Sequence, residues 1–493
     1  MSKQYRPWTP EQAYLLPPSP MEWLPEGHLA YFLLEVIGEL DLGAIEAILQ
    51  EKDPRGERPY PPRMMTSLIL YAYCTGTFSS RKIERATFED VALRVIAGGS
   101  HPHWTTINGF RLRHRAALAG LFTQVLKLCS RSGLRTLGHV ALDGSKVQAN
   151  ASKHKAMSYG RMKDDGKRLA AEIEVLLRRA EDVDAAEDRQ FGPDKSGNEL
   201  PAELQHREPR LRRIREAKAE LEKEAAEARA AQLRENAVEL RVQAEAIGTI
   251  PGQRKQCRTR AARSEQQADE LAPRDDDDDS GAGGSGGTQL PLHQVPTTPE
   301  GKPVEKAQRN FTDADSRIMP RNGVFMQAYN GQAAVSEDQI IVAHGLTNAP
   351  QDVEQLAPMV ERIRENCGAM PGILTADSGY ISEKNIAYCE ATGINAYIAL
   401  KKTDAESRTM PTTSAQLARF IMGVKLHTAE GKAAYARRKV IVEPVFGQMK
   451  NAMGFRRFSL RGLLKASSEW GIVCTCHNLL KLFRAAARRT AQA

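Results

Sequence analysis

Two short apolar runs of this chain each lead directly into an aspartate, and they constrain its fold more than any other feature. The first run, 139–142, precedes Asp143 and Gly144, and the second, 372–376, precedes Asp377. Short apolar runs that end in turn residues predict buried strands. An unpaired charge at the end of such a strand is costly. The two aspartates therefore indicate either a site or a structural cap, and each alone fits both interpretations equally well.

The pattern between and after these runs predicts alternating strands and helices. Residues 323–336 and 339–347 are typical of two strands that could pair as a hairpin. An amphipathic helix is expected from Asp352, its N-cap, to residue 366. The run to Asp377 is followed by a predicted helix at 382–393, a strand at 395–400, a basic helix at 429–450 that is broken or kinked at Pro444, and a last helix at 464–489.

This element order is that of a ribonuclease-H-like α/β fold, a mixed sheet with flanking helices. Strand ends at one edge of such a sheet converge on a crevice. Asp143, Asp377 and Glu443, which lies on the basic helix, are therefore predicted to meet. Glu443 is the weakest of the three, because Pro444 makes its backbone uncertain. With 61 acidic residues in the chain, some Asp–Asp–Glu set always exists.

Three carboxylates of this kind suit phosphoryl transfer on DNA. Two Mg²⁺ ions about 3.5–4 Å apart can hold the attacking and leaving oxygens in line. Mg²⁺ prefers hard oxygen ligands and needs few protein contacts. The sequence therefore predicts a magnesium-dependent nuclease site.

Four passages resemble bacterial insertion-sequence transposases of the DDE type. They are LDGSKVQANAS, YNGQAAVSEDQIIVAHGLTN, ADSGYIS and RRKVIVEPVFGQMK, and they occur in the expected order. The chain is similar to the insertion sequence eleven-eighty-two group over about residues 20–155 and 310–485. The resemblance implies an enzyme that cuts DNA at the ends of a mobile element and joins the freed 3′-hydroxyl to target DNA, with Mg²⁺ or Mn²⁺.

The resemblance also assigns roles to individual residues. Asp143, Asp377 and Glu443 match the three metal-binding carboxylates of the family. Lys450, seven positions after the glutamate, matches the lysine of the family's terminal signature, which implies a contact to a DNA phosphate.

The same signature contains a tyrosine and an arginine, which Tyr435 and Arg438 resemble. The spacing from Arg438 to Glu443 is one residue longer than in related families, and Lys439 lies one position closer. Arg438 and Lys439 both remain candidates for the arginine's role. The long stretch between Asp143 and Asp377 also departs from compact members of the family.

Residues 1–135 are predicted to be helical and to bind DNA. Within them, 101–128 resembles a short helix followed by a basic one, which fits a helix-turn-helix DNA reader. The second helix is expected to carry a basic cluster: Arg111, Arg113, His114 and Arg115. A helical bundle with a solvated basic face is an equally good interpretation.

The chain is basic, with a formal charge of +8 and a pI near 9.0, which weakly favours a polyanionic partner. Residues 451–493 hold eight Lys or Arg against Glu469, so their charge of 8 − 1 = +7 accounts for most of that excess. Arg456 and Arg461 are among them. Phosphate contact is the functional interpretation, and a solvated basic helix is the alternative.

Residues 161–247 are predicted to form a helical hairpin or coiled coil that binds a partner subunit or packs on itself. Apolar residues recur at helical spacing in two sets: Leu169, Ile173, Leu176, Ala180 and Val183, and Leu211, Ile214, Leu221, Ala225 and Ala228. Residues 273–297, which contain five consecutive aspartates, Asp275–Asp279, and a Gly/Ser run, are expected to be a flexible linker without fixed metal geometry.

Other candidate sites have simpler explanations. Asp313 and Asp315 are explained as well by a turn before a strand as by a second carboxylate pair. Cys474, Cys476 and His477 form half a metal site, and core packing is the better interpretation. No nucleotide-binding glycine loop is present, so neither ATP nor NAD is implied.

Seven irregularly spaced cysteines, no signal-peptide pattern and no long apolar run predict a reduced, soluble, cytosolic protein. The resemblance implies the bacterial cytoplasm and association with the nucleoid. The predicted organisation is a helical DNA-binding domain (1–135), the first part of the catalytic domain (136–155), a helical hairpin with its linker (156–310), the rest of the catalytic domain (311–463) and a basic C-terminal helix (464–493).

The predicted partners are double-stranded DNA, as terminal inverted repeats and target, and further copies of the chain in a homodimer or higher oligomer on that DNA. Two other functions remain open. One is a ribonuclease-H-like nuclease that hydrolyses DNA without joining it. The other is a non-catalytic DNA-binding protein derived from a transposase, which the complete carboxylate triad disfavours.

Overall fold

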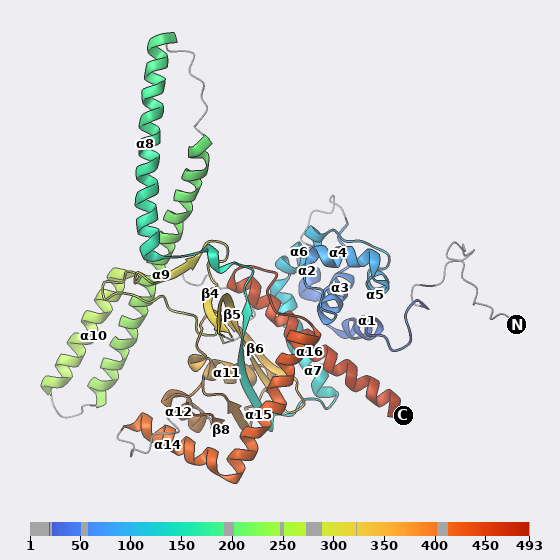
Figure 1. Ribbon diagram of the computed structural model, residues 1–493. Helices are drawn as coiled ribbons and strands as arrows, with labels where there is room; N and C mark the ends of the chain where they lie inside the picture. The colour runs from blue at the N-terminus through green and yellow to red at the C-terminus, as the bar shows by residue number, and fades with distance from the viewer. Residues whose placement is uncertain are drawn as a thin grey trace.

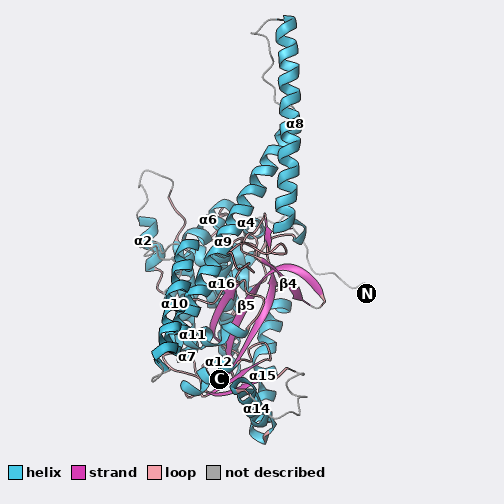
Figure 2. Cartoon of the chain, turned by 90° about the vertical axis from the view of Figure 1, so that its left-hand side faces the viewer, coloured by secondary structure: helices cyan, strands magenta, loops and turns pink. Residues whose placement is uncertain are grey.

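The computed structural model describes residues 19, 22–50, 58–191, 202–246, 251–272, 288–321, 323–401 and 413–492. It has a sheet at its centre, helices around the sheet, and a helical insertion that projects from this body (Figures 1 and 2). The acidic run Asp275–Asp279, the Gly/Ser run after it and residues 192–201, between the two halves of the expected hairpin, lie outside the described residues. Among the described helices, none combines the length and apolar character needed to cross a membrane.

The central sheet is mixed. Its strands are β1 (His139–Gln148), β4 (Arg317–Arg321), β5 (Val324–Ser336), β6 (Ile341–Thr347), β7 (Ile373–Ala376) and β8 (Asn395–Ile398). The order is β4-β5-β1-β7-β8, and β6 pairs with the second half of β5, beyond β4. β5 is antiparallel to β1 and to β6, as the predicted hairpin requires, whereas β7 and β8 run parallel to β1. Two short strands, β2 (Ala156–Ser158) and β3 (Gln308–Asn310), form a separate ribbon.

Strand β1 does not end at Asp143, as the sequence suggested, but continues to Gln148. The reason is that β5 pairs with β1 along its length, from Val140 to Gln148. On the other edge, β7 pairs with β1 only as far as Leu142. Asp143 therefore stands at the end of the parallel pairing, in the middle of an antiparallel strand.

The N-terminal region is helical, as predicted. Its helices are α1 (Leu29–Glu39), α2 (Gly43–Gln50), α3 (Pro62–Cys74), α4 (Ser80–Glu89), α5 (Val91–Ile96), α6 (Trp104–Arg113) and α7 (Arg115–Arg131). The expected pair of helices at 101–128 is present as α6 and α7. Arg111 and Arg113, however, lie in the last turn of α6 and not on the second helix, because the chain turns at His114.

The helices that follow β6 along the chain are α11 (Leu356–Cys367), α12 (Glu383–Ala391), α14 (Ser414–His427), α15 (Ala429–Gly447) and α16 (Leu463–Gln492). A π-helical turn, Gln448–Ala452, extends α15. Helix α14 was not anticipated from the sequence. Asp352 precedes a 3-10 turn, Val353–Gln355, and its side chain caps neither that turn nor α11.

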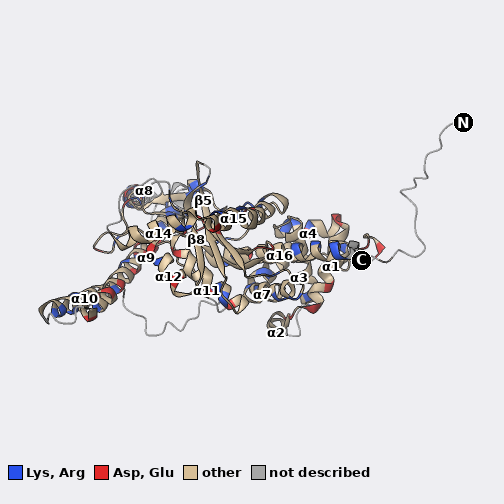
Figure 3. Ribbon diagram, turned by 90° about the horizontal axis from the view of Figure 1, so that it is seen from below, with Lys and Arg blue, Asp and Glu red and all other residues tan. Residues whose placement is uncertain are grey.

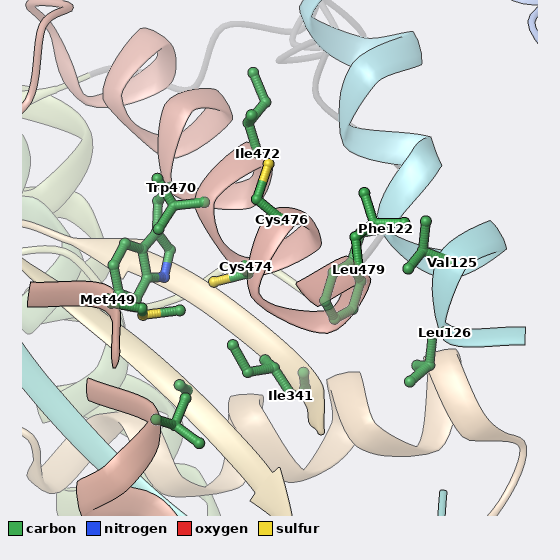
Figure 4. Packing of buried hydrophobic residues seen from close by; sticks show 14 of the residues in the cluster. Phe122, Val125, Leu126, Ile341, Met449, Trp470, Ile472, Cys474, Cys476 and Leu479 are labelled. Carbon is green, nitrogen blue, oxygen red and sulfur yellow. The ribbon is translucent and has the colours of Figure 1, made fainter. Parts of the chain in front are cut away.

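One hydrophobic core joins the N-terminal helices to the sheet. Helix α16 packs against α3 and α7 on one side and against β6 on the other. Figure 4 shows Phe122 and Val125 of α7 near Leu479 of α16, with Ile341 of β6 beside them. Trp470 is 1% exposed and belongs to the same core. The helical region and the sheet are therefore held together by shared apolar burial.

The described residues of the insertion form three long helices and not two. They are α8 (Tyr159–Phe191), α9 (Ala202–Ala246) and α10 (Pro251–Leu271). The first half of α9 packs against α8 through Leu169, Ile173, Leu211 and Ile214, as the periodicity predicted. Its second half packs against α10 through alanine-rich contacts such as Ala237 with Ala261. Leu176, Ala180 and Val183 carry no described side-chain environment.

The second half of the expected linker, residues 288–297, is built into the fold. Leu290 is buried in the main core. The Thr288 backbone N–H donates to Glu365 at 3.1 Å, and its carbonyl accepts from Arg362 at 2.6 Å. Leu290 packs against Gly345 of β6. The neighbouring Gly/Ser run made the whole stretch resemble a linker, so this buried residue was not anticipated.

Helix α15 continues through Pro444 and is not broken there. Proline has no N–H, so the carbonyl four residues earlier, of Val440, lacks its usual partner in the helix. The Gln339 side-chain amide donates to this carbonyl at 2.9 Å. Gln339 lies in the β5–β6 turn with φ of 61°. A side chain from the sheet thus replaces the missing helical hydrogen bond.

Candidate active site

Asp143 and Asp377 lie next to each other because of strand register. Leu142 of β1 pairs in parallel with Ala376, the last residue of β7, and each of these residues is followed directly by an aspartate. Beyond this pair the two strands separate. The carboxylates therefore share the mouth of the fork between β1 and β7, as the sequence predicted.

Helix α15 places a guanidinium between these two carboxylates. Arg438 Nη2 lies 2.9 Å from Asp143 Oδ2 and 4.0 Å from Asp377 Oδ2. Arg438 is 8% exposed. A buried cation held between two acids is strongly favoured over an unpaired one. The backbone N–H groups of Gly144 and Gly379 each donate to the neighbouring carboxylate at 2.8 Å.

Burial sets the protonation of Asp143. The pKa of Asp143 rises from 3.8 to about 6 as a net result: burial is the largest cause, the charge of Arg438 opposes it, and the charge of Asp377 adds to it. An added positive charge nearby would stabilise the ionised form of such a buried carboxylate. The fork therefore favours a cation beside Asp143.

Glu443 and Lys450 line the same cleft as Asp143. This open cleft, of about 320 Å³, is also lined by Arg321 and Arg456. The π-helical turn, which carries Lys450, places its Nζ 5.5 Å from the Phe446 ring. Burial, together with the charge of Arg321, lowers the pKa of Lys450. Three cations around a carboxylate-lined cleft form a surface suited to a phosphodiester.

The structure brings two of the three predicted catalytic carboxylates together and leaves the third apart from them. Asp143 and Asp377 share Arg438, whereas Glu443 is exposed on α15. In the part of the chain that the structure describes, no three His, Cys, Asp or Glu side chains lie close enough together to hold one metal ion. Two carboxylates therefore form the centre of the site, and the third lies at its cleft.

The environments of Arg438 and Lys439 differ. Arg438 is buried at the carboxylates, whereas Lys439 is exposed on α15. Tyr435 is half-buried, and burial raises its pKa. The positive charge of Arg438 opposes this rise. Of the two candidates for the signature arginine, Arg438 has the position at the site.

Arg111 does not have the position expected of a DNA-binding residue. It is 3% exposed, and its guanidinium donates to the Tyr73 hydroxyl at 2.7 Å and the Ser80 hydroxyl at 2.6 Å. Tyr73 in turn donates to buried Glu469 at 3.0 Å. Arg111 is therefore part of the polar interior between α3, α6 and α16. Arg113, two residues later, is exposed.

Two other predicted DNA contacts lie beside the cleft. Arg456 Nε donates to the Lys450 carbonyl at 3.1 Å, and Arg461 Nε donates to the Asn150 carbonyl at 3.0 Å. Both side chains are exposed. Arg456 also donates through Nη2 to Asn451 Oδ1 at 2.6 Å, so both its Nε and its Nη2 groups are engaged by neighbouring residues.

A third aspartate near the site, Asp352, was predicted only as a helix cap. Asp352 Oδ1 accepts from Asn330 at 2.6 Å and from Gln332 at 2.7 Å, and Lys146 Nζ lies 3.3 Å away. The signal in the sequence was Asn330 and Gln332, two polar residues spaced by two in an otherwise buried strand. Such residues need a buried polar partner.

The remaining candidate sites are structural. Asp313 accepts from the Tyr329 hydroxyl at 2.6 Å, and Asp315 accepts from the Leu463 N–H at 2.8 Å, at the start of α16. Cys474, Cys476 and His477 are buried in the core. The turn and core-packing interpretations therefore hold for both sets.

Two family models match the chain. The model described as Transposase domain (DUF772) matches residues 18–113, and the one described as Transposase DDE domain matches residues 295–479. Together they cover more than half of the chain. The second match includes Asp377 and Glu443 but begins after the insertion that separates it from Asp143.

Comparison with curated proteins and with solved structures returned no match. The two matched domains occur in the order in which the helical region and the sheet occur in the structure. They agree with the resemblance carried by the sequence motifs. Both matched models describe transposase domains, and together they support a DNA transposase of the DDE type, from the insertion-sequence transposases.

Proposed function

We propose that this transposase cleaves DNA at the ends of its element and joins the freed 3′-hydroxyl to target DNA, with Asp143, Asp377 and Glu443 as its metal-binding carboxylates. The observation that carries the proposal is the register of β1 with β7, which sets Asp143 beside Asp377. The strand order β6-β5-β1-β7-β8, with β5 antiparallel and β7 and β8 parallel to β1, supports a ribonuclease-H-like catalytic domain.

The donor set fits Mg²⁺ or Mn²⁺. Asp143 and Asp377 already accommodate a positive charge, the Arg438 guanidinium, and they offer the hard oxygens that these ions prefer. Asp143 and Asp377 would hold the ion. Glu443, which lines the same cleft but is not grouped with them in this structure, would have to approach them to serve as the third ligand. When bound, the metal supplies Lewis acidity to the phosphodiester and lowers the pKa of the attacking oxygen.

The chain's own cations position the DNA. Lys450, Arg321 and Arg456 line the cleft beside Asp143 and would neutralise the phosphates on either side of the reacting bond. Arg438 holds the two aspartates at fixed separation until the substrate arrives. The substrates proposed are terminal inverted repeats and target DNA, bound by a homodimer or higher oligomer in the bacterial cytoplasm. The N-terminal helices, through α6 and α7, are proposed to read the element ends, and the insertion sequence eleven-eighty-two group is the proposed subgroup.

Cleavage and joining of a labelled element end test the proposal. Asp143→Asn, Asp377→Asn and Glu443→Gln should each abolish both reactions in Mg²⁺ while keeping or improving DNA affinity, because neutral side chains no longer repel the phosphate. Asp315→Asn is the matched control, since this aspartate caps α16. Near-normal cleavage by a folded Asp143→Asn protein would refute the proposal. Cleavage without joined products by the native protein would indicate a nuclease instead.

A further inference from the structure

The first half of α10 has an unusual charge pattern. Over residues 251–264 it has no acidic residue but five cations, all exposed: Arg254, Lys255, Arg258, Arg260 and Arg263. In the described part of the chain none of the five forms an ion pair. Other cations of the insertion differ, since Arg212, Lys218 and Lys223 each lie 3.5–3.8 Å from a glutamate four residues later.

This pattern destabilises the helix that carries it. Arg254 and Arg258 are four residues apart, where like charges repel by about 0.2–0.5 kcal/mol. Arg254 and Lys255 lie in the first turns of the helix, where the helix dipole disfavours cations. The buried side of α10 consists of small alanines, Ala261 and Ala268. Like charges four residues apart and cations at the N-terminal end both disfavour this helix, and its packing does not compensate for them. Such a conflict indicates a functional surface.

We propose that this face of α10, the basic face defined by Arg254, Lys255, Arg258, Arg260 and Arg263, binds the phosphate backbone of double-stranded DNA. The inference rests on the proposed function and extends it, because it adds a DNA-binding surface outside the cleft at Asp143. Figure 3 shows α10 extending to one side of the sheet, with basic residues along it. A polyanion at this face offsets both the mutual repulsion and the unfavourable dipole contact.

The salt dependence of DNA binding tests the basic face. The probe is a 40-base-pair duplex of random sequence. Replacing all five cations with glutamine should weaken binding and lower the slope of log affinity against log salt by about 0.9 for each phosphate that these cations neutralise in the native complex. The control is the triple variant Arg212→Gln, Lys218→Gln, Lys223→Gln, whose cations are paired with glutamates and should change the slope little. An unchanged slope in the five-residue variant overturns the proposal.

A second measurement uses the native protein, so it does not depend on the variant's folding. Lys255 and Lys223 are both exposed, on α10 and α9. Bound duplex should protect Lys255 from acetylation and leave Lys223 reactive. Equal acetylation of Lys255 with and without DNA overturns the proposal. Neither result depends on cleavage, so failure of the basic face leaves the carboxylate test unaffected.

Asp352 carries a second, independent inference. It approaches the fork between β1 and β7 where two glycines make room. A side-chain carbon at Gly144 would lie 2.7 Å from Asp352 Oδ1, and one at Gly379 would lie 3.3 Å from Asp352 Oδ2 and 2.9 Å from Asp377 Oδ1. The Asp352 and Asp377 carboxylates therefore both lie against Gly379, and a side chain at this position would crowd both of them.

Two links tie Asp352 to the loop that carries Asp377. Gln332, which donates to Asp352, accepts from the Tyr380 hydroxyl. The Asn385 side chain donates to the carbonyls of Val353, at 2.6 Å, and Tyr380, at 2.7 Å. The loop 377–380 is thus fixed to the turn at Asp352 by buried hydrogen bonds, which are costly to break.

We infer that Asp352 is a positioning residue, which holds the loop 377–380 so that Asp377 stays beside Asp143. This inference rests on the proposed metal-binding role of that pair. Residues behind metal ligands typically affect metal affinity about 10–100-fold. Asp352→Ala should therefore weaken Mn²⁺ binding at least about tenfold. Asp352→Asn, which keeps the Oδ1 acceptor of Asn330 and Gln332, should weaken it less.

Calorimetric titration of the DNA-free protein with Mn²⁺ measures this affinity without reference to catalysis. The control is Asp338→Ala, an exposed aspartate in the β5–β6 turn. High Mn²⁺ should restore cleavage by the Asp352 variants. Folded Asp352 variants with native Mn²⁺ affinity overturn the inference. If the native protein also fails to bind Mn²⁺, the proposed function itself fails, so the two failures are distinct.

Discussion

At the scale of single residues, the site is built around one buried ion pair, between Asp143 and Arg438. Asp143 and Arg438 are both largely removed from water and lie 2.9 Å apart. Burying either alone would be strongly unfavourable. The raised pKa of Asp143 shows that the pairing offsets the burial in part, which leaves a site that gains from further positive charge.

This pairing predicts a pH dependence of stability. The pKa of Asp143 is about 6 in the folded protein, against an ordinary value of 3.8, which applies to the unfolded chain. Between these values the folded state holds a proton that the unfolded state has lost, so the free energy of unfolding should fall as pH rises from about 4 to 6. The fall is about 3 kcal/mol at most. Urea unfolding in EDTA should show it in the native protein and not in Asp143→Asn. Parallel pH profiles for the two proteins would contradict this assignment.

A second prediction separates Arg438 from its neighbour. Arg438→Gln leaves the Asp143 charge buried without a partner, so it should lower the free energy of unfolding by about 3 kcal/mol at pH 7.5. The loss should be smaller at pH 5, where Asp143 is protonated. Lys439→Gln, one residue along the same helix but exposed, should change stability by less than about 0.5 kcal/mol. Equal losses in the two variants would show that Arg438 has no special role.

At the scale of elements, strands with a clear period were predictable, and elements without an apolar pattern were not. The β5–β6 hairpin followed from two apolar runs separated by a short polar turn. Helix α10 escaped notice because its buried residues are alanines, spaced among charges, and give no amphipathic signal. The continuation of β1 past Asp143 depends on pairing with β5, which a Gly–Ser pair in the sequence concealed.

The site was predictable to the same extent. Asp143 and Asp377 could be placed together because parallel strands bring their ends to one edge. Arg111 was placed on the surface because arginine is usually exposed, and its burial depends on Tyr73 and Ser80, far away in sequence. Asp352 satisfied the local pattern of a helix cap, and only the folded sheet brings Asn330 to it.

The missing helical hydrogen bond at Pro444 gives a prediction for α15. Gln339→Ala removes the donor to the Val440 carbonyl and should cost about 1 kcal/mol. In a Pro444→Ala background the helix supplies its own N–H, so the same change should cost less. A double-mutant cycle by urea unfolding measures the difference. Additive losses would mean that Gln339 stabilises the protein solely through its other contact, with Lys481.

At the scale of the whole molecule, the apolar residues divide it into a body and an insertion. The main core contains residues of α1, α3, the central sheet, α15 and α16. No member of the four small clusters along α8, α9 and α10 belongs to it. Apolar burial therefore joins the N-terminal helices to the sheet. Among the described residues, the apolar clusters of the insertion are separate from this main core.

This division predicts two levels of stability, because local opening is governed by local burial. Amide hydrogens of α7, β1 and α16 should exchange only by global unfolding and share one high protection. Those of α10, which buries Ala261 and Ala268 against α9, should exchange far faster. Hydrogen exchange of the DNA-free protein, followed by mass spectrometry, measures both. Leu240→Ala in the insertion should speed exchange in α10 alone, whereas Leu126→Ala in the main core should speed it across α7, β1 and α16. Uniform loss of protection in both variants would mean that the molecule unfolds as a single unit.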